Sequence, residues 1–474
     1  MGAGRAGRAG RAGRTGRTGR TGRTGRTGRT GRVTHTGTEA EDGNGNGANG
    51  PGTKGSLKRG MNQLTPDLSR ARSHFPTAPP EAAAFLAGPG RTGPSFGFTD
   101  PALERIAHKL DRKERLDFED GLAMLRTRDV TGYGRAGRPP EDRAVGDQVF
   151  FVFPIVRSIR PTRVCSTASS ATMRFALWTT HYAMTIDEIL GKITPELSEV
   201  HIVSGLHHKW KFDYYVDIIR QIRIAYPKIQ IKAWTAVEID FFAKISKKSI
   251  EEVLATLVEA GLDSMPGGGA EVFSERVRAE LFQHKIGAEE WLNVHRIAHR
   301  MGIPTNSTLL YGHIETLEER VHHLLALRAL EDEAPGFLAF IPLEFQLGYS
   351  NLRTRSASSV DGLRTVAASR LLLDNIPHVK AYWVMLGEDV ASIALNFGAS
   401  DMDGTILEEK IAHAALAGSP VGVARDRLVH LIHEAGKLPV ERDALYNIKA
   451  RYPEAAPDPS GAGAMAGSAS AGRP

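Results

Sequence analysis

The stretch SEVHIVSGLHHKWKFDYYVDIIRQIRIAYPKIQIKAWT, residues 198–235, decides the fold. Its short apolar run VHIVSG (200–205) predicts a buried strand, and the amphipathic run FDYYVDIIRQIRIAY (212–226) predicts a helix. A second apolar run, IQIKAWT (229–235), predicts the next strand. A strand, a helix and a strand in this order form a βαβ unit, whose two strands are parallel.

The same alternation continues along the chain. Further strand candidates are LDSMPG (262–267), TNSTLLY (305–311), FLAFIPL (337–343), VKAYWVML (379–386), IALNFG (393–398) and a segment near 149–157. Together these make eight strands, which favours an α/β fold, a TIM-type (β/α) barrel closed, or nearly closed, around a packed interior. An open doubly wound sheet is the alternative, and it is disfavoured because no G-x-G-x-x-G follows a predicted strand.

Composition divides the chain into four parts. Residues 1–98 are rich in Gly, Arg, Thr, Pro and Ala, and we expect a disordered low-complexity tail. Residues 99–148 form a helical N-terminal segment, in which Asp100-Pro101 is a plausible helix start. Residues 149–450 form the barrel domain, and the Pro-, Gly- and Ala-rich residues 451–474 form a second disordered tail.

The charge and cysteine content restrict the class of protein. The net charge of +6 comes from ten arginines in residues 1–32, and residues 61–474 carry about −4, so the barrel gives no sign of a nucleic-acid partner. No apolar run reaches the roughly 18 residues of a membrane helix. A single cysteine excludes a disulfide framework. We expect a cytoplasmic protein that acts on a small molecule, with neither a nucleic-acid nor a membrane partner.

Candidate catalytic residues follow the predicted strands directly. In parallel barrels the chemistry lies at the carboxyl ends of strands. His207 in SGLHHKW (204–210), Glu238 in AVEID (236–240) and His313 in YGHIET (311–316) occupy such ends, where they can contact substrate or carry protons. Adjacent side chains on extended backbone diverge, so His207 and His208 are not expected to share a metal ion, and no residue is predicted as a metal ligand.

A glycine run marks another strand end, PGGGAE (266–271). Glycine lets the backbone approach a ligand closely, and its amides can bind an anion. We expect Gly268, Gly269 and Glu271 to shape the cofactor or substrate pocket. The alternative is a tight turn with Glu271 as the acid at the start of the next helix. DMDGT (401–405) has acids at metal-loop spacing but lacks the remaining calcium ligands, so it predicts a turn.

Six strings closely resemble the aminodeoxyfutalosine synthase family of radical S-adenosylmethionine (SAM) enzymes. They are GLHHKWKFDYYVDIIR (205–220), AVEIDFFAKISKKSIEEVL (236–254), GLDSMPGGGAEVFSERVR (261–278), TNSTLLYGHIET (305–316), DNIPHVKAYWVMLGEDVASIALNFG (374–398) and DMDGTILEEKI (401–411). The resemblance covers about residues 183–420, with a weaker part at 100–127. It is closer to this family than to the cyclic dehypoxanthinylfutalosine synthases or the deazaflavin-forming relatives.

The resemblance implies a radical SAM barrel that uses a [4Fe–4S] cluster and SAM. The implied activity is transfer of the 5′-deoxyadenosyl group to 3-[(1-carboxyvinyl)oxy]benzoate, a chorismate-derived enolpyruvyl benzoate, giving aminodeoxyfutalosine for menaquinone biosynthesis. A reductant such as flavodoxin or ferredoxin is the implied protein partner.

The family's cluster motif is missing from this chain. The family spaces three cysteines as C-x3-C-x2-C after the first strand, because three thiolates hold the cluster and leave one iron open for SAM. This chain has only Cys165, within PIVRSIRPTRVCSTASSATMRFALWTTH (154–181). Read literally, that segment cannot hold a cluster. The alternatives are a catalytically dead barrel that only binds a ligand or partner, or an unrelated metalloenzyme using His207, Glu238 and His313.

A displaced reading frame permits the motif at the family's spacing, and chance permissiveness of the genetic code is the alternative explanation. If each codon takes the third base of one residue and the first two of the next, a cysteine codon arises only before Val or Ala. Val164, Ala168 and Ala171 satisfy this condition, and the hidden cysteines have the spacing C-x3-C-x2-C. The same displacement permits Pro-Thr-Asn across residues 159–162, a turn that precedes the motif in the family. We therefore predict a frame-shifted stretch at about 151–181, and an active enzyme as the true gene product.

Overall fold

The computed structural model describes residues 98–130, 132, 147–159, 161–163, 182–195, 197–207, 209–347, 352, 357–407 and 422–454. The two predicted disordered tails, apart from their innermost residues, lie outside the described residues. Residues 164–181, which carry the predicted cysteine positions of the displaced frame, also lie outside them.

The described strands are mostly short and parallel. They are β1 (Gln148–Ile159), β2 (Thr162–Arg163), β3 (Tyr182–Ala183), β4 (Glu199–Ile202), β5 (Gln230–Ala233), β6 (Thr305–Tyr311), β7 (Phe337–Glu344), β8 (His378–Val379), β9 (Asp401–Leu407), β10 (Leu438–Arg442) and β11 (Ile448–Arg451).

The strand pairings follow a circuit that returns to β1. Strand β1 pairs with β4, and β4 pairs with β5, all in parallel. Single parallel bridges, Lys232 to Ser264 and Met265 to Thr305, join β5 to β6. Parallel pairs then join β6, β7 and β8, and a bridge from Lys380 to Asp401 leads to β9, which pairs with β1. This is the βα-barrel arrangement that the sequence predicts.

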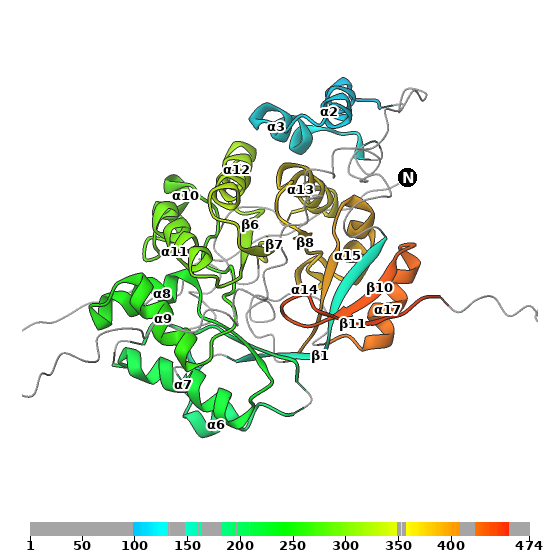
Figure 1. The fold of residues 1–474 in the computed structure, drawn as a ribbon. Coiled ribbons are helices and arrows are strands. Elements are labelled where there is room, and N and C mark those ends of the chain that lie inside the picture. The colour runs from blue at the N-terminus through cyan, green and yellow to red at the C-terminus, as the bar shows by residue number, and fades with distance from the viewer. Residues whose placement is uncertain are drawn as a thin grey trace, which may run out of the picture. The chain divides into compact units, whose positions relative to one another are not determined.

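Helices lie outside this circuit of strands (Figure 1). They are α2 (Pro101–Asp111), α3 (Phe118–Arg126), α6 (Ile186–Leu190), α7 (Phe212–Ala225), α8 (Ala236–Ser246), α9 (Ile250–Ala260), α10 (Glu275–Leu281), α11 (Ala288–Arg300), α12 (Leu317–Glu333), α13 (Ser359–Leu372), α14 (Trp383–Leu386), α15 (Glu388–Ala394), the 3-10 turn η4 (Leu395–Phe397) and α17 (Arg425–Glu434).

Capping residues set several of the strand-to-helix turns. Thr235 lies two residues after the end of β5 and caps α8, with Glu238 completing a reciprocal capping box. Thr316 caps α12 with Glu319 in the same way. The cap satisfies backbone N–H groups that would otherwise lack partners, so each helix begins at a defined residue just beyond its strand.

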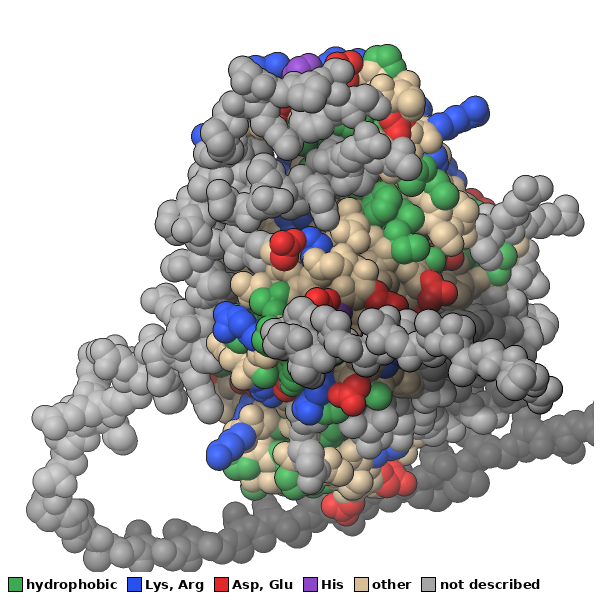
Figure 2. Space-filling model, turned by 90° about the vertical axis from the view of Figure 1, so that its right-hand side faces the viewer, with side chains coloured by type: hydrophobic (Ala, Val, Ile, Leu, Met, Phe, Trp, Pro, Cys, Tyr) green, Lys and Arg blue, Asp and Glu red, His purple; other side chains and the backbone are tan. Residues whose placement is uncertain are grey.

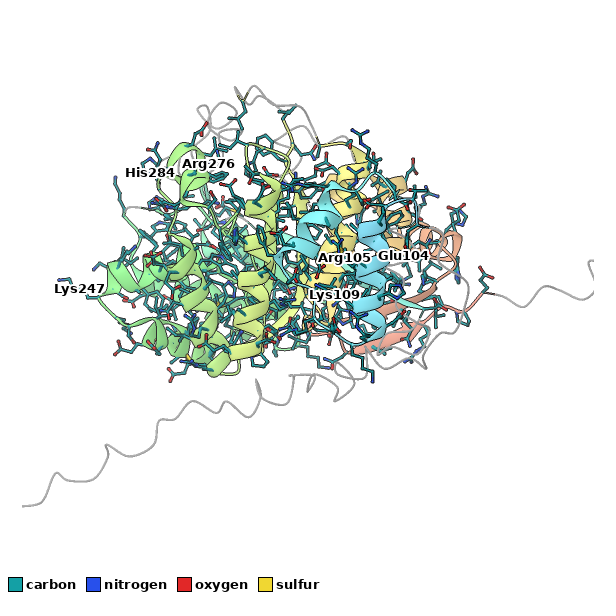
Figure 3. The ribbon with its side chains drawn as sticks, turned by 90° about the horizontal axis from the view of Figure 1, so that it is seen from above. Glu104, Arg105, Lys109, Lys247, Arg276 and His284 are labelled. Atoms are coloured by element: carbon teal, nitrogen blue, oxygen red, sulfur yellow. The ribbon has the colours of Figure 1, made fainter. Side chains whose placement is uncertain are left out.

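The N-terminal helices pack on the barrel's helix layer. The Asp100 side chain accepts a hydrogen bond from Ala102 N at 2.9 Å, and proline follows it, which confirms the predicted start of α2. The helical stretch predicted over 100–126 is split into α2 and α3. Helix α3 packs against α12 and α13, and Figure 3 shows α2, with Lys109 labelled, beside it.

Two strand predictions near the C-terminus are wrong. Residues 379–386 contribute only the end of β8 before α14, and residues 393–398 end α15 and form η4. Both apolar runs are buried along one side of short helices, and a short apolar run does not distinguish a helix from a strand. The barrel strand is instead β9, over the residues predicted as a turn. Asp403 in β9 has a φ of 65°, and the pairing of β9 with β1 is irregular.

The core is one hydrophobic cluster between strands and helices. Large side chains at its centre include Trp234, Trp291 and Trp383, all nearly without exposed surface. On the face shown in Figure 2, hydrophobic, acidic and basic side chains are interspersed. Within the described residues, none of the helices has the length and apolar character needed to cross a membrane.

Candidate functional site

Glu238 ties the loop after β4 to the start of α8. Its buried carboxylate accepts hydrogen bonds from Ser204 N at 2.6 Å, Thr235 N at 2.8 Å and Thr235 Oγ1 at 2.7 Å. These contacts join the carboxyl ends of two neighbouring strands. The side chain therefore fixes the position of the 203–207 loop relative to β5.

His207 lies in that loop, on an aromatic platform. Its ring stacks on Trp210 with centroids 4.7 Å apart, and its Nδ1 accepts a hydrogen bond from Lys209 N at 3.3 Å. The backbone N–H of His207 donates to the Tyr215 hydroxyl at 3.3 Å. Burial raises the pKa of Tyr215 to about 12, so this hydroxyl stays neutral. His208 lies outside the described residues.

The glycine run packs against two neighbouring elements. A Cβ on Gly267 would lie 2.5 Å from Asn306 O, and one on Gly269 would lie 2.6 Å from Val237 Cγ2. Gly269 also has a φ of 91°, which side chains rarely adopt. Gly268 differs, because among the described atoms its Cβ would meet Thr235 Cγ2 alone, at 3.4 Å. Packing thus accounts for two of the glycines and leaves Gly268 with space beside it.

Glu271 lies in a pocket next to α10 and α11. Its φ is 49°, and its carboxylate pairs with Lys285 Nζ. Further lining residues are Gly269, Phe273, Arg278, Phe282 and Trp291. Helix α10 is capped by Ser274, so Glu271 is not the acid of its first turn. The indole N–H of Trp291 donates to Gly268 O at 3.4 Å, which links this pocket to the glycine run.

His313 occupies the turn between β6 and α12. Its Nε2 donates to Leu310 O at 3.0 Å, and its Nδ1 accepts from Ile314 N at 2.8 Å. Glu315 Oε2 lies 3.0 Å from the same Nδ1, and Glu315 also pairs with Arg320 at 2.8 Å. Although burial opposes it, the charge of Arg320 and the backbone N–H groups of Gly312 and His313 lower the pKa of Glu315 to about 2. His313 thus follows β6, whereas Glu238 follows β5.

Sequence reasoning missed the polar interior of the barrel. Buried ion pairs face one another there: Lys232 Nζ with Glu199 at 2.9 Å, Lys380 Nζ with Asp403 at 3.0 Å, and Arg442 Nη2 with Asp401 at 2.6 Å. The packed interior that the sequence predicts therefore contains buried ion pairs, which the sequence analysis did not identify. The signal was available, because polar residues alternate with apolar ones in EVHI (199–202), QIKA (230–233) and DMD (401–403).

The residues as printed do not fit an iron–sulfur cluster. Such a cluster takes thiolate ligands, and the chain has the single cysteine Cys165, which lies outside the described residues. Within the described ranges, no group of three His, Cys, Asp or Glu residues is arranged to hold a metal ion.

Comparison with known proteins finds close relatives. Residues 334–455 match the CofH/MqnC C-terminal region. Aminodeoxyfutalosine synthase of Thermus thermophilus is 43% identical over 361 residues, covering 74% of this chain and 96% of the relative. The enzyme of that name from Streptomyces coelicolor is 40% identical, covering 76% and 97%. Cyclic dehypoxanthine futalosine synthase of Halalkalibacterium halodurans is 33% identical, covering 73% and 95%.

Solved structures agree on the fold. The FeFe-hydrogenase maturase HydG of Carboxydothermus hydrogenoformans has a TM-score of 0.56 at 14% identity, covering 73% of this chain and 81% of that chain. Methylornithine synthase (PylB) has a TM-score of 0.53 at 15% identity, covering 71% and 97%. At such low identity these two structures bear on the fold alone.

Proposed function

The chain belongs to the aminodeoxyfutalosine synthase family of radical SAM enzymes, and we propose that its gene encodes an active member. The proposed reaction transfers the 5′-deoxyadenosyl group of SAM to 3-[(1-carboxyvinyl)oxy]benzoate and gives aminodeoxyfutalosine. A small electron carrier such as flavodoxin or ferredoxin would supply the reductant.

One observation carries this proposal: the match to the Thermus relative spans 96% of that protein. Only about a quarter of this chain lies outside the match, so wherever the match begins it includes residues 151–181. The family sequence is thus present on both sides of the segment that lacks the cysteines. A short displaced frame inside an otherwise intact gene accounts for this pattern.

The misfit of the cluster follows from the same displacement. As printed, the chain holds too few thiolates to bind the cluster. The frame-shift proposal assigns the missing ligands to cysteine codons that straddle the junctions before Val164, Ala168 and Ala171.

The described residues have proposed roles at the strand ends. Gly268, with space beside it, and Gly269 would shape the pocket for SAM or substrate. Glu271 would line it together with Lys285. His207 is proposed as a substrate contact, and Glu238 as the residue that positions the His207 loop. His313 stays a candidate for substrate contact from the β6 end.

A second candidate function is a catalytically inactive barrel that binds ligand or a partner. The printed residues 154–181, with one cysteine, are the observation that favours it. The two candidates differ in measurable properties of the purified protein.

Protein expressed from the natural gene tests the proposal. Under anaerobic purification we expect iron and sulfide in equal amounts and formation of aminodeoxyfutalosine. Protein expressed from a synthetic gene that encodes the printed sequence should bind no cluster and give no product. A colourless natural gene product that binds SAM without turnover would favour the inactive barrel, and SAM cleavage by the printed sequence would contradict the account.

A further inference from the structure

Three polar side chains form a row across the barrel interior. His201 on β4 is in register with Lys232 on β5, and Lys232 bridges in parallel to Ser264. Partners in register point to the same side of a sheet. The alternate residues Val200, Ile202, Ile231 and Ala233 belong to the core between strands and helices, so the row faces the interior.

The row has hydrogen-bonding capacity that the described protein does not use. His201 Nε2 and Ser264 Oγ are buried, and neither has a hydrogen-bond partner within the described part of the chain. Lys232 is 5% exposed, and Glu199 is its one hydrogen-bond partner among the described residues, at 2.9 Å. An ammonium group carries three donors, so two remain. Buried polar groups are normally satisfied, and such a concentration of unused donors indicates a ligand.

We propose that the row His201–Lys232–Ser264 binds a carboxylate of the substrate. This inference rests on the proposed function, whose substrate carries two carboxylates. Lys232 lies in the middle and would donate to one carboxylate oxygen, while Ser264 Oγ–H and a ring N–H of His201 donate from either side. Neighbouring strands are about 4.8 Å apart, and side chains inside a barrel converge toward its axis, so one carboxylate can meet adjacent members of the row.

The charges of the ion pairs around the row balance, so they do not repel a carboxylate. Burial, and after it the charge of Lys232, lowers the pKa of His201 to about 4, so the imidazole is neutral at pH 7 and presents a donor without an extra charge. Glu199 neutralises one charge of the interior, and Lys380 pairs with Asp403. The three side chains of the row offer hydrogen-bond donors, and their acceptors are limited to the hydroxyl and imidazole lone pairs. A hard cation requires several oxygen ligands, which the row does not provide.

Binding of the acid by the full-length protein tests the row, because binding is measured without turnover. Isothermal titration calorimetry would use 3-[(1-carboxyvinyl)oxy]benzoate as probe and its dimethyl ester as the uncharged probe. We expect Ser264→Ala to raise the Kd of the acid about tenfold, the loss of one hydrogen bond to a charged group. The ester should bind the wild type and Ser264→Ala equally.

Ser307→Ala is the matched control. Ser307 is also buried, and its Oγ has no hydrogen-bond partner among the residues that the structure describes. It lies two residues after Thr305, whose hydroxyl contacts His295 and His299 of α11, so by strand alternation it faces the helices. Its replacement should leave the Kd of the acid within about twofold of the wild type.

A second variant guards against an effect on folding. Lys232→Met with Glu199→Gln removes both charges of the pair and leaves no buried charge unpaired. This double variant should raise the Kd of the acid more than tenfold and leave the Kd of the ester unchanged. Any of three results would overturn the inference. They are equal Kd values of the acid for the wild type and Ser264→Ala, a rise in Kd for Ser307→Ala as large as that for Ser264→Ala, and no binding of the acid to the wild type. If the expected pattern is found but the natural enzyme forms no aminodeoxyfutalosine, the row stands and the proposed function fails.

Discussion

Asp401→Asn should destabilise the barrel strongly, because it breaks a buried ion pair between β9 and β10. The Asp401 carboxylate has no exposed surface; it accepts a hydrogen bond from Arg442 Nε at 2.6 Å, and Arg442 Nη2 lies 2.6 Å from it. The guanidinium is 1% exposed, and Asp403 lies 3.8 Å from it. Removing one partner of a buried pair leaves the other charge without compensation.

The expected loss in the free energy of unfolding is about 3 kcal/mol, the low end for a broken buried pair, because the amide oxygen can still accept a hydrogen bond. Urea denaturation followed by circular dichroism measures it. With a denaturant slope of about 3 kcal/mol per M, the midpoint should fall by about 1 M. The control is Lys244→Ala, which removes the exposed partner of Asp240 and should cost less than about 0.5 kcal/mol. A loss below about 1 kcal/mol for Asp401→Asn would refute the reasoning.

Three further changes test other parts of the fold. Burial lowers the pKa of His299 to about 4, so the wild type should lose up to roughly 3 kcal/mol of unfolding free energy as pH falls from about 6.5 to 4. His299→Gln should not show this part of the loss when urea melts of the two proteins are compared at each pH. Burial raises the pKa of Glu331 to about 7, so the wild type should lose stability as pH rises through 7, whereas Glu331→Gln should not. Melts of both proteins at pH 5 and pH 8 measure this, and an equal change in stability for the two proteins would contradict it. Gly267→Ala places a Cβ 2.5 Å from a backbone oxygen of β6 and should lower the free energy of unfolding by more than about 2 kcal/mol. Gly268→Ala should lower it by less than about 0.5 kcal/mol. Thermal melts compare the two variants, and equal losses of stability would show that the glycine run is one rigid turn.

The βα alternation predicts most of the barrel because burial dictates it. A strand covered on both faces is commonly a continuous apolar run, as in FLAFIPL (337–343), whose predicted bounds agree closely with β7. TNSTLLY (305–311) coincides with β6, although its first four residues are polar and buried. The strand prediction fails where a short apolar run is buried as a helix. VKAYWVML is apolar because it is buried, yet Gly387, at a φ of 79°, follows a short helix and not a strand.

The site is harder to predict because its chemistry depends on which residues face one another. Glu238 and the glycine run stand at strand ends, as expected. Glu238 accepts a hydrogen bond from Ser204 N, and Gly268 lies beside the Thr235 side chain, so each of these contacts joins segments far apart in the sequence. The interior ion pairs are visible in the sequence only as charged residues inside apolar strands. Their pairing, such as Arg442 with Asp401, depends on the strand order and register, which the pattern alone does not specify.

The central claim is that this gene encodes the three cluster cysteines although the printed chain shows one. Sequencing the DNA across codons 145–185 tests it most directly. We predict compensating single-base errors or shifts that bracket the segment, with three cysteine codons spaced C-x3-C-x2-C in the corrected frame. Error-free DNA that encodes the printed residues 151–181 would contradict the account and leave a barrel of this family without its cluster ligands.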